Sequence, residues 1–328
     1  IGSLVLMSDK PSGRISWLIQ RGRTLALVAR LALLATLTHT TFIHFRALNE
    51  KPWRLLFLLN SNRTYLCQSS TTGFTEREEI VMAVQRQKPL KLVNISASHL
   101  IRLHESWKVP NHPAAVGLPI FDFGSPRERN TWVSFVEDES DEYFRKEFLK
   151  SDLEESAEIG VFILGFLGAA GFSKNPDSLK KLLRETFQAL ASAQLDIPIF
   201  VKPHPVTDKS ILLDVVNQTK GLTIIITGLH PSILATRSRF FIGNCYSNTF
   251  YDAHVFGVPT IEYGEYSEEL AKALGGKSSR PEYVTHYIQS DIKQLKAVLR
   301  GYRRKNIVKH PIASATDETG LIKLLAKS

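Results

Sequence analysis

Two short groups of polar residues, each placed just after an apolar run, could carry chemistry in this chain. The first is Lys202-Pro203-His204-Pro205, which follows the apolar run 197–201. Lysine supplies a compact positive charge, histidine can donate a hydrogen bond to a phosphate oxygen, and the prolines fix the turn. A lone histidine is more often an ordinary loop residue, but its grouping with a lysine at a strand end favours anion binding.

The second group is Ser247-Asn248-Thr249, which lies between the apolar run 240–243 and an expected helix over 247–256. Unpaired N–H groups at the start of a helix, together with neighbouring hydroxyls, favour a phosphate group. One such residue would suffice as an N-cap, whereas three occur here in succession. We expect these residues both to cap the helix and to bind a ligand.

Two weaker features could belong to the same site. A loop that contains Gly165 and Gly168 would let backbone N–H groups approach a phosphate or a ribose closely. Its spacing is not GxGxxG, so an ordinary flexible loop explains it equally well. Glu262 ends a later apolar run. It could hold a ribose hydroxyl or be a solvated surface residue, and the sequence does not separate these alternatives.

The elements that must position these residues alternate regularly in the second half of the chain. We expect strands over 159–164, 197–201, 222–226, 240–243 and 259–262, and helices over 179–193, 208–218, 231–236, 247–256 and 291–300. This alternation predicts a parallel, doubly wound sheet. Because ligands bind outside the carboxyl ends of such strands, the polar groups are expected to gather at one edge.

The first half is less regular and carries no sharp motif. We expect strands over 1–7, 41–45, 53–59 and 90–95, and helices over 15–37, 75–87 and 98–107. Prolines and an acidic run mark a change of composition over 110–152, and we place a linker near 136–156. The sequence thus predicts an α/β protein with two doubly wound Rossmann-like domains facing across a cleft, covering 1–150 and 151–328.

The expected helix over 15–37 has two interpretations. Arginines flank an apolar stretch about long enough to span a bilayer, which is typical of a signal anchor. Arg30 and His39 lie inside the candidate span, where a charge is costly, so a buried helix of an α/β domain is favoured. A peripheral contact between this basic end and a membrane stays open, as does a Golgi-type anchor, because the chain begins at Ile1 rather than Met.

Composition sets the remaining limits. The chain has 328 residues, a formal net charge of +9 and only two cysteines, Cys67 and Cys245. This length suits two domains, and the positive charge favours anionic partners. The basic residues are scattered, so nucleic acid is not the expected partner. Two separated cysteines suit a reducing compartment, and we expect a cytoplasmic protein.

Residues 160–265 resemble the donor-binding half of GT-B glycosyltransferases, in particular the bacterial capsule and lipopolysaccharide enzymes that use CMP-activated sialic acid or Kdo. Those enzymes carry a His-Pro motif and a downstream Ser/Thr motif that bind the CMP group. Here the motifs correspond to His204-Pro205 and Ser247-Asn248-Thr249. The acidic catalytic motif of the sialyltransferase first domain is not found. Teichoic-acid-type polyol-phosphate transferases share a similar motif pair and form a close alternative.

The resemblance implies a glycosyltransferase that moves a sugar from a nucleotide-activated donor, with a CMP-sugar favoured, to a glycan or glycolipid acceptor in surface polysaccharide synthesis. Lys202, His204 and Ser247 would neutralise the departing phosphate. Asp9 is the favoured base for the acceptor hydroxyl, with Asp122 and His112 as rivals. No cofactor is expected, and metal-independent chemistry is expected because no carboxylate pair has ligand spacing. A CDP-polyol phosphotransferase, a sugar-nucleotide epimerase and a non-catalytic binding protein remain alternatives.

Overall fold

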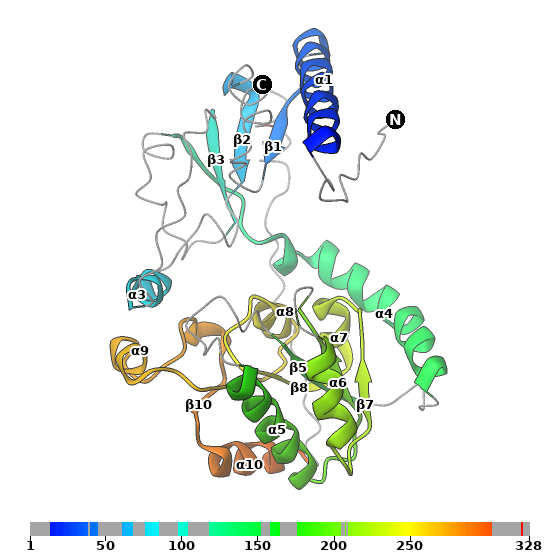
Figure 1. Cartoon of the computed structure of the whole chain (residues 1–328), viewed down its shortest axis with the longest axis vertical. Helices are drawn as coiled ribbons and strands as arrows, with labels where there is room; N and C mark the ends of the chain where they lie inside the picture. The colour runs from blue at the N-terminus through cyan, green and yellow to red at the C-terminus, as the bar shows by residue number, and fades with distance from the viewer. Residues whose placement is uncertain are drawn as a thin grey trace. The chain divides into compact units, whose positions relative to one another are not determined.

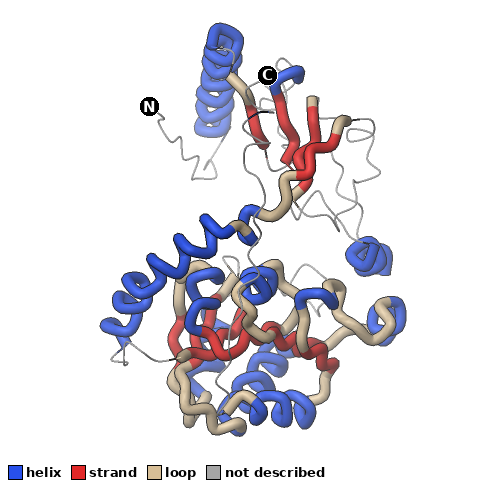
Figure 2. Tube along the Cα trace, turned by 180° about the vertical axis from the view of Figure 1, so that it is seen from behind, coloured by secondary structure: helices blue, strands red, loops and turns tan. Residues whose placement is uncertain are grey.

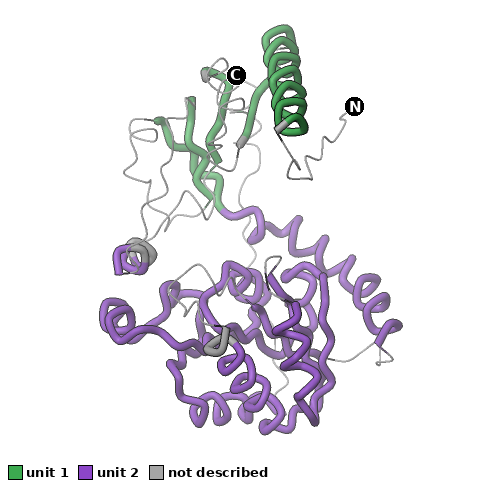
Figure 3. Tube along the Cα trace, viewed as in Figure 1, with its two compact units in different colours: residues 1–74, 90–124, 317–328 green, residues 75–89, 125–316 purple. Residues whose placement is uncertain are grey.

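The structure of this chain is a computed structural model that describes residues 14–38, 40–44, 61–67, 76–84, 98–103, 118–151, 158–164, 176–204, 207, 209–303 and 323. The chain divides into two compact units (Figure 3). Unit 1 comprises residues 1–74, 90–124 and 317–328, and unit 2 comprises 75–89 and 125–316. The domain boundary predicted at residue 150 falls near the end of a helix of unit 2, and that boundary stays a prediction.

Unit 1 contains a parallel sheet of four strands in the order β1-β2-β3-β4. Its described elements are α1 (Arg14–Thr38), β1 (Phe42–His44), η1 (Ser61–Arg63), β2 (Thr64–Cys67), β3 (His99–Arg102) and β4 (Ile120–Asp122). A small apolar cluster that includes Tyr65, Cys67 and Ile101 holds the middle strands together. The strands predicted over 1–7, 53–59 and 90–95 lie outside the described residues.

Unit 2 contains a parallel sheet of six strands in the order β10-β9-β8-β5-β6-β7 (Figure 1). Its strands are β5 (Ile159–Ile163), β6 (Ile199–Lys202), β7 (Ile224–Ile226), β8 (Ser238–Gly243), β9 (Thr260–Gly264) and β10 (His286–Gln289). In chain order, β5 to β7 build one side of the sheet and β8 to β10 the other. This is the Rossmann order, and its switch point lies between β5 and β8.

Helices cover both faces of this sheet (Figure 2). One face packs against α5 (Pro176–Ser192), α6 (Lys209–Gln218) and α10 (Ile292–Gly301). The other packs against α4 (Asn130–Ser151), α7 (Pro231–Arg237) and α8 (Thr249–Val255). The remaining described elements of the unit are α3 (Glu76–Val84), α9 (Glu268–Ala273), η2 (Pro126–Glu128) and η3 (Pro281–Tyr283). The central strands β5, β6 and β8 are mostly apolar because both of their faces are buried. The predicted α/β fold class with parallel sheets is confirmed.

Two predictions about the elements were wrong, and a third was correct in type but not in burial. The helix predicted over 98–107 is strand β3 where the structure describes it, because Leu100 and Ile101 are both buried inside the sheet. The linker predicted over 136–156 is largely α4, whose acidic residues lie on solvent-facing sides while Val136 and Phe144 pack inward. The helix predicted over 15–37 is present as α1, but only one of its faces is buried.

Candidate functional site

The two strands that precede the polar groups end at the same level of the sheet in unit 2. In the strand register, Ile163 at the end of β5 pairs with Lys202 on one side and with Gly243 on the other. Neighbouring strands are separated by nearly 5 Å, so the Lys202 and Gly243 backbones lie about 10 Å apart across β5. The chain continues from Lys202 into His204 and from Gly243 into Ser247. Both groups therefore follow strand ends that flank the switch point, where open α/β sheets bind ligands.

Lys202 is the last residue of β6 and its side chain is partly buried. Its Nζ donates to the carbonyl oxygen of Gly228 at 3.3 Å. Burial lowers the pKa of Lys202, and the negative charge of Asp252 opposes this effect. With a neutral carbonyl acceptor and an acidic neighbour, Lys202 keeps a positive charge at the sheet edge that an anion could share.

His204 lies two residues beyond β6 and is exposed. Its carbonyl oxygen accepts a hydrogen bond from the Thr207 backbone N–H at 2.8 Å, which closes a tight turn after the strand. The predicted partners Pro205, Gly165 and Gly168 lie outside the described residues. The proposed role of His204 in ligand binding stays a prediction.

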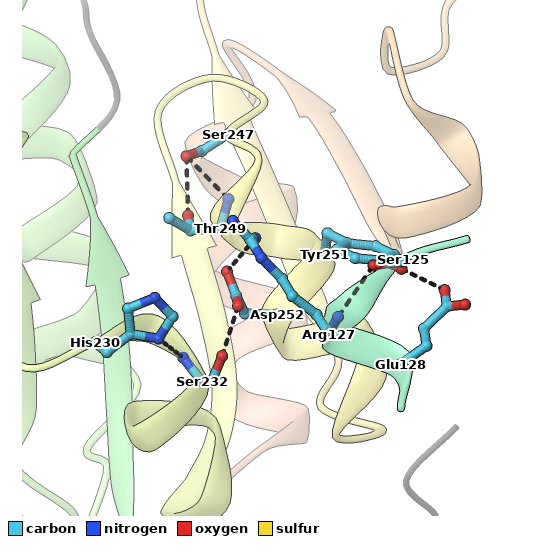
Figure 4. A network of polar contacts seen from close by, with 9 residues as sticks. All are labelled: Ser125, Arg127, Glu128, His230, Ser232, Ser247, Thr249, Tyr251 and Asp252. Carbon is cyan, nitrogen blue, oxygen red and sulfur yellow. Dashed lines mark hydrogen bonds and ion pairs between the residues drawn. The ribbon is translucent and has the colours of Figure 1, made fainter. Parts of the chain in front are cut away.

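Ser247 and Thr249 are joined by their hydroxyls at the start of α8 (Figure 4). Thr249 donates to Ser247 Oγ from its hydroxyl at 2.9 Å and from its backbone N–H at 3.4 Å. Asn248 is exposed and makes no side-chain capping bond. A side chain at Gly243 would not fit, because a Cβ there would lie 2.9 Å from the Phe250 ring. The turn is therefore compact, and Ser247 rather than Asn248 supplies the local hydroxyl contacts.

A buried carboxylate beneath this turn was not predicted from the sequence. Asp252 on α8 is only 1% exposed. Its Oδ2 accepts from Arg127 Nη1 at 2.9 Å, and its Oδ1 accepts from Ser232 Oγ at 2.6 Å (Figure 4). Burial raises the pKa of Asp252, while Arg127 and the Ser232 hydrogen bond lower it. The ion pair and the hydroxyl compensate the cost of burying this charge.

His230 joins the same network at the start of α7. Its Nδ1 accepts from the Ser232 backbone N–H at 3.2 Å, and its ring packs edge-on against Trp132. Burial lowers the pKa of His230; Asp252 raises it, and the positive charges of Arg127 and Lys202 lower it further. The imidazole is therefore neutral near pH 7, and because Nδ1 accepts, Nε2 carries the proton.

Two bonds tie η2 to α8. Besides the Arg127–Asp252 pair, the Tyr251 hydroxyl donates to the Glu128 carboxylate (Figure 4). Ser125 caps η2 by accepting from the Arg127 backbone N–H at 3.3 Å. The Arg127–Asp252 and Tyr251–Glu128 contacts join residues more than a hundred positions apart in the chain. No local spacing in the sequence could reveal them, although the Ser-Pro pair before Arg127 does indicate a short helical turn.

Glu262 lies in β9 and is as deeply buried as Asp252. The hydroxyls of Ser278 and Tyr266 and the backbone N–H of Tyr246 donate to its carboxylate. Burial raises the pKa of Glu262, and these hydrogen bonds lower it. The alternative of a solvated surface residue is wrong. Binding of a ribose by Glu262 stays a prediction, and both of its carboxylate oxygens already accept from protein hydroxyls.

The three candidate bases lie in the first half of the chain. Asp9 and His112 lie outside the described residues. Asp122, in β4, forms a bidentate salt bridge with Arg102. Arg102 Nε donates to Oδ1, and Nη2 donates to Oδ2 at 2.7 Å. The hydrogen bond from Arg102 lowers the pKa of Asp122, which makes this carboxylate a weaker base. Among the described residues, no group of three His, Cys, Asp or Glu side chains could hold a metal ion.

No protein-family model matches this chain, and no curated protein matches it. Solved structures do. UDP-GlcNAc 2-epimerase from Neisseria meningitidis, bound to UDP-GlcNAc, is similar over 98% of this chain and 84% of its own, with TM-score 0.55 and 11% identity. Os79 from O. sativa, in complex with UDP and deoxynivalenol-3-glucoside, is similar over 86% and 73%, with TM-score 0.46 and 11% identity. The wall teichoic acid polymerase TagF is similar over 80% and 66%, with TM-score 0.40 and 13% identity.

At such low identity the likeness shows the fold alone. The match that covers nearly the whole chain, together with the Rossmann strand order of unit 2, shows that the chain has the GT-B fold with two Rossmann-like domains. The fold does not by itself name a reaction, because one fold supports several chemistries.

Proposed function

We propose that this protein is a glycosyltransferase that takes a sugar from a nucleotide-activated donor, with a CMP-sugar favoured, and passes it to a glycan or glycolipid acceptor. One observation carries the proposal. Lys202 and Gly243 end the two strands that flank β5 at one level of the sheet, and the hydroxyl group at Ser247 follows four residues after Gly243. A phosphate at this switch point would be reached from both sides. The preference for CMP rests on the resemblance of the two motifs.

In this mechanism the acceptor oxygen attacks the anomeric carbon and forms the new C–O bond. The bond between the anomeric carbon and the phosphate oxygen breaks, and its electron pair goes to the phosphate. Lys202 and His204 stabilise that negative charge by charge and hydrogen bonding, and the Ser247 hydroxyl donates to it. The acceptor proton goes to a carboxylate of the first domain, for which we propose Asp9. Gly165 and Gly168 are proposed to contact the rest of the donor.

The first test is calorimetric titration of the full chain with CMP, CDP, UDP and GDP. Lys202→Met is expected to weaken the affinity for the tightest-binding of these nucleotides by about tenfold or more, because a charge-assisted contact to phosphate is lost. Lys220→Met is the matched control. Lys220 is exposed and precedes the amino end of β7, whereas the candidate site lies at the carboxyl ends of the strands. Equal affinities in wild type and Lys202→Met would contradict the proposal.

The second test separates the reactions that this fold supports. His204→Ala is expected to abolish sugar transfer while leaving the thermal unfolding midpoint unchanged, since His204 is exposed. Retained transfer in this variant contradicts the role of His204.

Mass analysis of the product distinguishes the alternative reactions. A phosphate retained in the product indicates a polyol-phosphate transferase, and acceptor-free conversion of the donor sugar indicates an epimerase. Nucleotide binding without any product indicates a non-catalytic binding protein.

A further inference from the structure

Helix α1 exposes an apolar face opposite the one that it buries. Thr24, Val28 and Ala35 pack inward. Of the sixteen large hydrophobic side chains that are exposed in the described part of the chain, eight lie on this one helix. Scattered exposed apolar residues need no explanation, but a concentration of this kind on one helix marks an interaction surface.

Four of these eight side chains share one side of the helix with Ala26. At 100° per residue, Ile15, Ile19, Ala26, Leu33 and Leu37 fall on one outward side, opposite the buried face. All five are exposed, and the fractions reach 76% at Ile15 and 68% at Leu37. We call these five residues the outward face of α1.

Arginines border the outward face on one side. Arg23 and Arg30 lie along this border and are exposed. Arg21 lies nearer the buried face, with its guanidinium 4.2 Å from the centre of the Trp17 ring. The helix contains no aspartate or glutamate. Positive charge therefore lies beside an apolar strip, and no acidic residue of the helix compensates it.

This pattern matches a helix that lies in the plane of a membrane surface. No helix in the described ranges is long and apolar enough to cross a bilayer. In an interfacial helix the apolar side enters the boundary between head groups and acyl chains, while arginine side chains reach outward to the lipid phosphates. A protein partner with an apolar groove would not require positive charge beside the apolar strip, whereas an anionic lipid surface favours it.

We propose that α1 docks this protein on an anionic lipid bilayer, with the outward face in the acyl boundary and Arg23 and Arg30 on lipid phosphates. The proposal is independent of the proposed function, since it concerns only the surface of α1. It also explains why the helix is apolar on two faces: one face packs against the protein and the other against lipid.

The test is sedimentation of the full chain with vesicles. Vesicles of phosphatidylcholine with about a third phosphatidylglycerol are expected to bind the protein, and pure phosphatidylcholine vesicles to bind it far less. Arg23→Glu/Arg30→Glu is expected to weaken binding to the anionic vesicles by about tenfold or more. Lys293→Glu/Arg300→Glu on α10 is the matched control, because it makes the same charge change at the same spacing of seven residues. Equal losses in both variants, or equal binding to neutral vesicles, would overturn the proposal.

A second measurement reports insertion directly. Cys67 and Cys245 are both buried, and burial raises the pKa of each thiol to about 12, so neither competes for a thiol-reactive dye. Ala26→Cys places one reactive thiol on the outward face, and Ala297→Cys places one on exposed α10 as control. The fluorescence emission of an environment-sensitive dye at residue 26 is expected to shift to shorter wavelength with anionic vesicles. The emission of the dye at residue 297 is expected to stay unchanged. No shift at 26, or the same shift at both positions, refutes docking through this face.

Discussion

Unit 2 holds two carboxylates that are equally buried but stabilised in different ways. Asp252 pairs with the cation Arg127 and with the Ser232 hydroxyl. Glu262 has only neutral donors, which are two hydroxyls and a backbone N–H. Burial raises the pKa of both groups. The same desolvation cost is therefore met by charge pairing in one case and by hydrogen bonding in the other.

The groups that each carboxylate influences also differ. The charge of Asp252 raises the pKa of Lys202 and of His230, which are the basic side chains near the candidate site. The charge of Glu262 instead raises the pKa of Cys245 and Tyr266, which already titrate far above neutrality. The charge of Asp252 therefore acts on basic side chains near the candidate site, whereas the charge of Glu262 acts on a thiol and a phenol that stay protonated near pH 7.

The largest effect is expected for Arg127→Met. This variant leaves Asp252 buried without a cation, and breaking such a pair costs about 3 kcal/mol. The loss is expected at pH 7 and shrinks in acid. The pKa of Asp252, already raised in the folded state, rises further in the variant. The variant therefore keeps its full stability below the pKa of the unfolded state, where Asp252 is protonated in both states. Its free energy of unfolding falls as pH rises through the pKa of the folded state. Urea unfolding at several pH values measures this. Arg237→Met is the control, because the Asp141 carboxylate that pairs with Arg237 is exposed and stays solvated when the arginine is removed.

An intermediate effect is expected for Asp252→Asn on the pH profile of nucleotide binding. Lys202 must be protonated to hold a phosphate, so affinity falls as pH rises through its lowered pKa. Without the negative charge of Asp252 that pKa falls further, and affinity is lost at a lower pH than in wild type. Titrations between pH 7 and 10 measure the profile. Glu262→Gln is the matched variant and should leave the midpoint unchanged; a midpoint that moves in both variants would remove the distinction between the two carboxylates.

The smallest effect is expected for Glu262→Gln on stability. The amide keeps an acceptor for the hydroxyl donors, so the free energy of unfolding at pH 7 should change by about 1 kcal/mol or less. The folded pKa of Glu262 is raised, so wild type loses stability as pH rises from the unfolded pKa through the folded one, and the variant lacks that loss. The stability difference between wild type and variant should therefore depend on pH. A constant difference between pH 4 and 9 would show that Glu262 does not titrate in this way.

Most of unit 2 could be predicted from the sequence. Its strands are short apolar runs that end at glycine, proline or polar residues, and these boundaries are local signals. The strand β10 and the helix α9 were missed because neither has a continuous apolar run. Helix α4 was missed because Ser140 interrupts its buried stripe, where its hydroxyl donates to the Glu137 carbonyl oxygen at 3.0 Å.

The site could be predicted only in part. Lys202 and Ser247 were found because each follows a strand that has a clear apolar pattern. Arg127, His230 and Asp252 were not found, because their partnership exists only after η2, α7 and α8 pack together. Asp252 in particular follows Tyr251 inside a helix, where a carboxylate is ordinarily a solvated residue. Its burial depends on tertiary packing, and no local pattern encodes that.

The most direct test of the central claim is a double-mutant cycle on nucleotide affinity. Lys202→Met, Ser247→Ala and the double variant are titrated with whichever of CMP, CDP, UDP and GDP binds wild type most tightly. If both side chains hold one phosphate, the two losses are coupled by about 0.5 kcal/mol or more. Losses that add within about 0.3 kcal/mol would contradict the claim that the loops after β6 and β8 form one site.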